Sequence, residues 1–196
     1  MASNSHAVIR PHFRLICTPA QQTQGEWLAS LVETVQPNAG ATVRVGWSVL
    51  RLQSFDGKLV LCEPDFDGNP FTDFRPSVST TLEVLAAEKS LLDRAGCAPV
   101  TWRYDEKVVV RRGAFGESRI VAQRQPPKDG DSGWYVASAD ERVGTPRPEE
   151  LEALWAYQLL QVRPELLAAF ALPAGWIAVW DGPTLVALTD ENDVAH

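Results

Sequence analysis

Apolar and polar residues alternate over several short runs of the chain, and this two-residue period predicts β-strands. The runs cover 13–17, 42–53, 58–63, 101–104, 107–111, 118–124, 133–138, 176–180 and 185–189. Asp56-Gly57, between the second and third runs, is typical of a tight hairpin turn.

Other stretches carry apolar residues three and four positions apart, which predicts amphipathic helices. The first helix is expected from the capping signal Thr23-x-x-Glu26 to a point before Pro37, and the second from Thr80-x-x-Glu83 to Gly96. Two more are expected after Pro148, with Leu151, Leu154, Trp155 and Leu159 on one face, and from Pro164 through Phe170.

Both halves of the chain therefore mix strands with helices, which favours an α+β fold. We expect two small mixed subdomains built on antiparallel sheets, each with packed helices. Ala98-Pro99 follows the second helix and is the best candidate boundary, giving domains 1–100 and 101–196. A Gly-Trp-x-Val sequence at Gly46 and again at Gly133 raises the hypothesis that the halves are repeats.

The formal net charge of −7 changes the range of expected partners. An acidic surface repels nucleic acid and anionic lipid, and it favours a basic protein partner. No apolar run approaches the length of about 18 residues that a membrane span requires, and no signal peptide is recognisable. The three cysteines lie far apart in apolar runs, so we expect reduced thiols and a cytoplasmic protein.

The sequence offers little for catalysis. His6, His12 and His196 lie near the two ends, and no pair of cysteines has zinc-ligand spacing. Residues 65–69 gather oxygen ligands, but their glycine is fourth, where a calcium loop needs it sixth. We therefore expect no enzyme, no metal and no cofactor. The alternative is a hydrolase that uses a pair of carboxylates without histidine.

Two acidic loops, 64–77 and 126–141, have the composition of a partner-binding surface, because each combines carboxylates with aromatic residues. The competing interpretation is that the carboxylates cap turns and the aromatic side chains pack in the core. The candidate partner-binding residues are Asp65, Asp67, Phe71, Asp73, Asp129, Asp131, Trp134, Asp140 and Glu141.

The second half also carries a recognisable motif. Asp131-Ser-Gly-Trp134 follows Arg124-x-Pro-Pro127 and precedes Ser138-x-Asp-Glu141, with further matches at 118–121, 163–167 and 172–175. This pattern resembles the Asp-Ser-Gly-Trp family of bacterial immunity proteins, long catalogued as a domain of unknown function. The resemblance covers roughly 103–188 and leaves the first hundred residues unmatched. Gln123-Arg124-Gln125 departs from the family's aromatic-Arg-Glu.

The resemblance implies a function, since proteins of this family occur beside polymorphic, contact-dependent or type VI toxins. It implies an immunity protein that binds a cognate toxin effector and blocks its active site. A nuclease fits the charge best, because nucleases carry basic surfaces for phosphate backbones. An acidic protein-binding adaptor remains an alternative.

Overall fold

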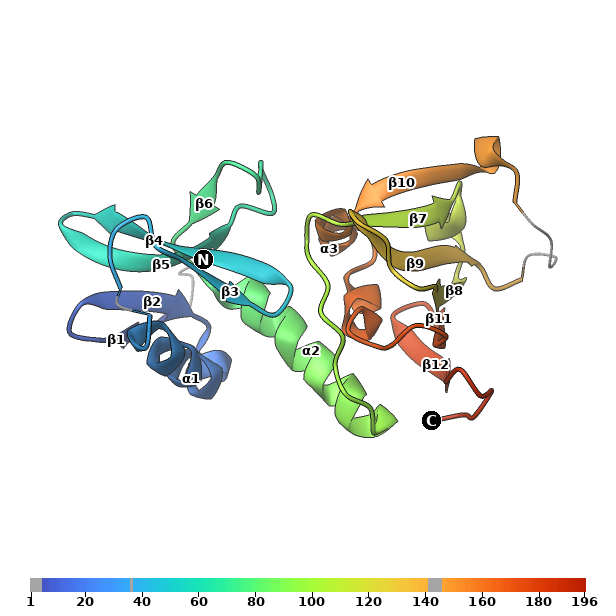
Figure 1. Cartoon of the computed structure of the whole chain (residues 1–196), viewed down its shortest axis with the longest axis horizontal. Coiled ribbons are helices and arrows are strands. Elements are labelled where there is room, and N and C mark those ends of the chain that lie inside the picture. Colours follow the sequence, from blue (N-terminus) through green and yellow to red (C-terminus); the bar gives the residue numbers. More distant parts are fainter. Residues whose placement is uncertain (1–4, 36, 141–145) are drawn as a thin grey trace. The chain divides into compact units, whose positions relative to one another are not determined.

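Strands dominate the structure, as the alternating runs predict. The computed structural model describes residues 5–35, 37–140 and 146–196, and within these ranges the strands form two six-stranded sheets (Figure 1). The chain divides into two units, Met1–Ala86 and Ala87–His196, with one sheet in each. Helix α2 (Ser79–Ala95) contributes residues to both units. The α+β fold class is confirmed.

The sheet of the first unit has the order β1-β2-β5-β4-β3, with β6 paired to the end of β5. Only β2 and β5 pair in parallel among these described strands, and the other pairs are antiparallel. The strands are β1 (His6–Ile9), β2 (Phe13–Cys17), β3 (Thr42–Val45), β4 (Ser48–Phe55), β5 (Lys58–Pro64) and β6 (Phe74–Arg75).

One hydrophobic cluster of the first unit lies on one face of this sheet, and residues 60–64 of β5 are buried on both faces. Helix α1 (Gln22–Glu33) follows the 3₁₀ turn η1 (Pro19–Gln21) and buries Leu28 and Val32 against that face, beside Val78 and Leu82. The alternation of buried and partly buried residues along β2 is the pattern of a strand with one core face.

The expected strand over 42–53 is wrong, because the structure divides it into the hairpin β3–β4. Gly46 forms the turn with φ of +56°, and a Cβ at this position would lie 2.4 Å from Cδ2 of Leu85. The turn therefore needs glycine for its conformation and for its contact with α2. The hairpin at Asp56-Gly57 is confirmed, with φ of +50° and +73°.

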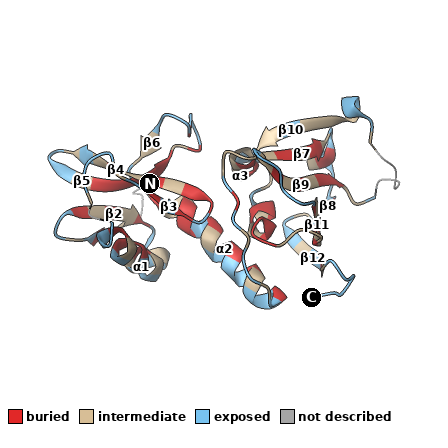
Figure 2. Cartoon of the chain, in the orientation of Figure 1, coloured by how far each residue is buried: buried red, intermediate tan, exposed pale blue. Residues whose placement is uncertain are grey.

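The sheet of the second unit has the order β10-β7-β9-β8-β11-β12, and only β7 and β9 pair in parallel among its described strands. Buried residues follow β7 and β9, whereas β12 is largely exposed (Figure 2). The strands are β7 (Lys107–Arg111), β8 (Arg119–Arg124), β9 (Asp131–Ser138), β10 (Leu151–Trp155), β11 (Ile177–Asp181) and β12 (Thr184–Thr189).

Short helical segments connect these strands. They are η2 (Ala114–Gly116), η3 (Pro148–Glu150), η4 (Ala156–Gln158), α3 (Leu159–Val162) and η5 (Pro164–Ala169). The last of them confirms the short helix expected from Pro164, although it has 3₁₀ geometry.

The helix expected after Pro148 is wrong, since residues 151–155 form strand β10. This strand pairs with β7 from Leu151 opposite Arg111 to Trp155 opposite Lys107, and Lys107 Nζ lies 3.1 Å from the centre of the Trp155 ring. Pairing with a distant strand has overridden the helical spacing. The strand expected over 101–104 is also wrong, because this stretch has no ladder partner and buries Trp102.

The two Gly-Trp-x-Val sequences occupy different places in their sheets. Gly46 lies in a turn before β4, whereas Gly133 lies inside β9, which pairs in parallel with the first strand of its unit. The strand orders of the two sheets also differ. The structure therefore gives no support to a duplication that aligns these two sequences.

Cysteine placement agrees with the expectation of free thiols. Cys17 and Cys62 are buried, Cys97 is partly buried, and all three are unpaired. None of the described helices has both the length and the apolar character to cross a membrane.

Candidate partner-binding surface

The turn that carries the Asp-Ser-Gly-Trp motif is closed by backbone hydrogen bonds. Lys128 and Asp131 exchange two of them, at 3.1 and 2.9 Å, around Gly130, which has φ of +75°. The amide of Gln125 then donates to the carbonyl of Gly133 at 2.8 Å. The turn is therefore a tight, fixed connection between β8 and β9.

Asp131 and Ser132 use their side chains inside this turn. The Asp131 carboxylate accepts the amide of Gly133 at 2.8 Å. The buried Ser132 hydroxyl donates to the carbonyl of Lys107 at 2.7 Å and accepts the amide of Trp134 at 3.3 Å. Both residues thus satisfy backbone groups that would otherwise be left without partners.

Gly133 lies close to the backbone of Gln125 in the facing segment. Its φ is +80°, and a Cβ there would lie 2.2 Å from the carbonyl oxygen of Gln125. A side chain would meet backbone rather than a flexible group, so only glycine fits this geometry.

Trp134 is a core residue with 1% of its surface exposed. Its ring stacks on Phe170 with centroids 5.3 Å apart, and Nε1 donates to the Phe170 carbonyl at 3.3 Å. This burial agrees with the competing interpretation of Trp134 as a core residue, and a contact of Trp134 with a partner stays a prediction that the burial disfavours.

Arg124 lies opposite Trp134 in the β8–β9 pairing and is equally buried. Its Nη1 donates to the carbonyls of Phe170, at 2.8 Å, and of Leu172. Burial lowers the pKa of this guanidinium. Together Arg124 and Trp134 attach the sheet to the segment after η5, so the motif that carries the family resemblance stabilises the fold.

Glu88, on α2, is a second buried ionisable group of this core. Its carboxylate accepts a hydrogen bond from Trp102 Nε1. Burial raises the pKa of Glu88 to about 7, against the opposing effects of that hydrogen bond and of the Arg124 charge. Burial raises the pKa of Glu106 in the same way.

The remaining predicted residues of this stretch lie at the surface or outside the described ranges. Asp129 and Asp140 are exposed. Asp131 is partly buried and already capped by the turn. Glu141 lies outside the described residues.

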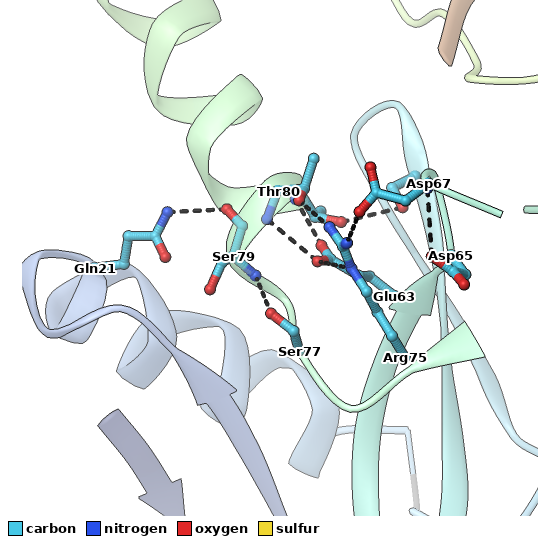
Figure 3. Close-up of polar contacts among 10 residues, drawn as sticks. Gln21, Glu63, Asp65, Asp67, Arg75, Ser77, Ser79 and Thr80 are labelled. Carbon is cyan, nitrogen blue, oxygen red and sulfur yellow. Dashed lines mark hydrogen bonds and ion pairs between the residues drawn. The ribbon is translucent and has the colours of Figure 1, made fainter. Parts of the chain in front are cut away.

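The other predicted loop begins at a buried carboxylate that the sequence did not reveal. Glu63 accepts the amide of Thr81 at 2.8 Å, in the first turn of α2. It also accepts the amide of Thr80 at 3.3 Å and the Nε–H of Arg75 at 3.1 Å (Figure 3). A carboxylate at a helix N-terminus satisfies free amides and interacts favourably with the helix dipole. Glu63, just before the loop, thus hydrogen-bonds both to Arg75 near the end of the loop and to the start of α2.

Further contacts hold this loop in one conformation. Arg75 Nη1 donates to Asp67 at 2.7 Å, and the amide of Asp65 donates to the carbonyl of Asp73 at 2.8 Å (Figure 3 shows the first pair). Phe66 is buried and stacks on Trp47 with centroids 4.9 Å apart. The loop is therefore ordered before any partner binds.

One aromatic side chain of this loop points to solvent. Phe71 is 45% exposed, and its amide is held by the side chain of Asn69 at 3.1 Å. Asp67 and Asp73 are exposed in the same loop, whereas Asp65 is partly buried. We call Asp67, Phe71 and Asp73 the Phe71 surface. It has the composition of an interface anchor beside charges.

Three structurally important residues were missed as such from the sequence. Arg124 continues the inward positions Ile120 and Ala122 of β8, so alternation alone could have placed it inside. Glu63 and Glu88 gave no comparable signal, since their partners are brought together only by the fold.

Comparison with known proteins adds a family. Residues 87–191, just over half of the chain, match the family model of the Imm33-like domain. No curated protein and no solved structure matches the chain. Among the described residues, no three histidine, cysteine or acidic side chains are grouped to hold a metal ion.

Proposed function

Since this chain belongs to the Imm33-like domain family, an immunity-protein-like family, we propose that it binds and neutralises a cognate bacterial toxin effector. The family match over 87–191 is the observation that carries this proposal. The chain acts in the cytoplasm as a stoichiometric inhibitor, and it converts no substrate. The toxin is a type VI secreted effector whose active site the bound chain occludes.

The surface chemistry supports a basic partner. Asp67, Asp73, Asp129 and Asp140 are exposed carboxylates, and the net charge is −7. Such a surface attracts a cationic protein and speeds the encounter. A nuclease is the toxin class whose substrate site is itself cationic, so a nuclease target fits best.

Pre-organisation supports the Phe71 surface as the anchor. Binding loses conformational entropy when a loop must become ordered. Here the hydrogen bonds that Glu63 accepts and Arg75 donates already restrict the loop, so less entropy is lost on binding. An exposed aromatic residue on a rigid loop is the feature that most often dominates interface energy. Trp134 and Asp131 suit this role less well, because the Trp134 side chain is buried and the Asp131 carboxylate already accepts an amide of its own turn.

The two other functions considered from the sequence have less support. A carboxylate-dependent hydrolase needs two carboxylates about 5–10 Å apart in one cleft. One hollow of the first unit has no carboxylate lining, and one in the second unit has only Glu165, which is paired with Arg163. An acidic adaptor differs from our proposal only in the protein that it binds.

Co-purification with the toxin encoded beside this chain tests the proposal. A tagged toxin should retain the untagged chain through a salt wash, and Phe71→Ser together with Asp73→Lys should weaken the retention. Asp67 is left unchanged because it pairs with Arg75. Glu83→Lys, an exposed change on α2, serves as the charge-matched control. Failure of the neighbouring toxin to retain the unmodified chain would contradict the proposal.

A further inference from the structure

A hollow of about 370 Å³ lies in the first unit, and none of its lining residues belongs to either acidic loop. It is lined by residues 9–14, from the end of β1 to the start of β2, and by residues 57–59 at the start of β5. Because β2 and β5 run parallel, both segments lie at the same end of the sheet. Its volume falls within the range of about 300–1,000 Å³ that is usual for small-ligand sites.

Arg14 lines this hollow, and the Nε of its guanidinium has no hydrogen-bond partner in the part of the chain that the structure describes. In the sheet register it lies between Ile9 on β1 and Val60 on β5. Its Nε atom is buried and makes no hydrogen bond to any described residue, and the side chain has no ion pair there. A buried donor without an acceptor is costly, so this group favours a ligand that accepts hydrogen bonds.

The other charges of the hollow leave an excess of positive charge. Arg10 is neutralised by Glu26 at 2.7 Å and by Glu33 at 3.3 Å. Lys58, at the start of β5, is exposed and has no ion-pair partner among the described residues. No Asp or Glu is part of the lining. Two uncompensated cations thus face one hollow on a chain of net charge −7.

The remaining walls are apolar. Ile9, which is 72% exposed, lines the hollow together with Phe13 and Leu59. A large exposed Ile beside a hollow is surface that a ligand's carbon atoms could cover. The site therefore combines an anion subsite with an apolar wall.

We propose that this hollow binds a carboxylate carried next to an apolar side chain on a segment of a partner protein. The planar guanidinium of Arg14 matches a carboxylate through two parallel hydrogen bonds, and Lys58 adds a second positive charge. The apolar walls favour such a segment over a free phosphate ion. The overall negative charge disfavours nucleic acid, which carries many phosphates. This site is independent of the proposed toxin neutralisation.

NMR titration of the ¹⁵N-labelled full chain tests this site. The probes are N-acetyl-leucine, its neutral analogue N-acetyl-leucinamide, and inorganic phosphate. N-acetyl-leucine should give saturable shifts of the amides of 9–14 and 57–59 and of the Arg14 Nε–H signal. The amide analogue, which lacks the carboxylate, should give none at the same concentration.

Variants separate the anion subsite from general charge effects. Arg14→Gln should weaken the binding of N-acetyl-leucine about tenfold or more, since Arg14 is partly buried. Lys58→Gln should weaken it about two- to fivefold, because Lys58 is exposed and water screens its charge. Arg44→Gln removes an exposed arginine of β3 that does not line the hollow, and it should change nothing. If Arg14→Gln does not fold, Lys58→Gln, at an exposed position after the turn, still tests whether the hollow recognises the carboxylate.

Several results would overturn the proposal. Equal shifts with the acid and the amide would show an apolar hollow without anion recognition. Saturation by phosphate, with no response to N-acetyl-leucine, would show a phosphate site instead. Unchanged binding in Arg14→Gln and Lys58→Gln, or no shift with any probe, would show that no such site exists.

Discussion

Alanine substitutions at Gly133 and Gly130 test whether the Asp-Ser-Gly-Trp turn stabilises the fold through a close backbone approach. Both glycines have positive φ, of +80° and +75°. An added Cβ at Gly130 would meet no atom within 4 Å, whereas at Gly133 it would lie 2.2 Å from the carbonyl oxygen of Gln125. The pair therefore separates backbone strain from steric conflict within one turn.

The expected magnitudes follow from these contacts. Left-handed backbone costs a non-glycine residue about 1–2 kcal/mol, and Gly130→Ala should lose only that. Gly133→Ala must also move the backbone at residue 133 away from Gln125. This movement weakens the Gln125–Gly133 hydrogen bond, which contributes about 1 kcal/mol, and it disturbs the packing of the neighbouring Trp134. Repacking of this kind costs about 1–3 kcal/mol. The total loss for Gly133→Ala is therefore about 3–6 kcal/mol.

Urea denaturation followed by near-ultraviolet circular dichroism gives both free energies of unfolding, because the buried Trp134 and Phe170 contribute to that signal. Gly133→Ala should lower the free energy of unfolding by at least about 2 kcal/mol more than Gly130→Ala. Equal losses in the two variants would refute the close approach and the structural role assigned to the motif.

Three further predictions concern charges. Glu88 has a folded pKa of about 7, above its ordinary 4.5, so its ionisation opposes folding. The free energy of unfolding should be greatest below pH 4.5, the ordinary pKa of Glu88. It should fall by about 3 kcal/mol in all as the pH rises from there through the folded pKa of about 7. Urea titrations at pH 5 and 8 should show a smaller fall in Glu88→Gln and an unaltered one in the exposed control Glu83→Gln. Glu63→Ala leaves Arg75 and two α2 amides without their acceptor, so thermal unfolding should show a loss of about 3 kcal/mol, and Glu83→Ala should cost far less. Asp129→Lys should slow association with the toxin and flatten its salt dependence in stopped-flow measurements, and unchanged kinetics would place the interface elsewhere.

Local signals allowed most elements to be predicted from the sequence. The Asp56-Gly57 hairpin and the end of α2 at Gly96 depend on residues that turn the chain by themselves. Both long helices follow the apolar spacing, but the expected caps are wrong, because Thr23 and Thr80 lie inside the helices and the distant Glu63 accepts the first amides of α2. Strand β10 could not be predicted, because it forms only by pairing with β7, about forty residues earlier. The division of 42–53 into two strands occurs at Gly46, whose positive φ of +56° the alternating pattern does not reveal.

The candidate partner-binding surface was also predicted only as far as local sequence signals allow. The composition of 64–77 and 126–141 predicted acidic loops, and exposed carboxylates are present in both. Whether an aromatic residue points inward depends on distant partners, however. Trp134 is buried because Phe170 lies beneath it, and Phe71 is exposed because Phe66 and Pro70 occupy the buried positions of its loop.

Inhibition of the purified neighbouring toxin tests the central claim most directly. The toxin's own activity is measured while this chain is added from below to above equimolar amounts. We predict a linear loss of activity that is complete near equal concentrations, as expected for tight binding of one inhibitor to one target. Full toxin activity at a large excess of the chain would contradict the claim, and so would inhibition at far less than equimolar amounts, which would show that the chain acts as an enzyme.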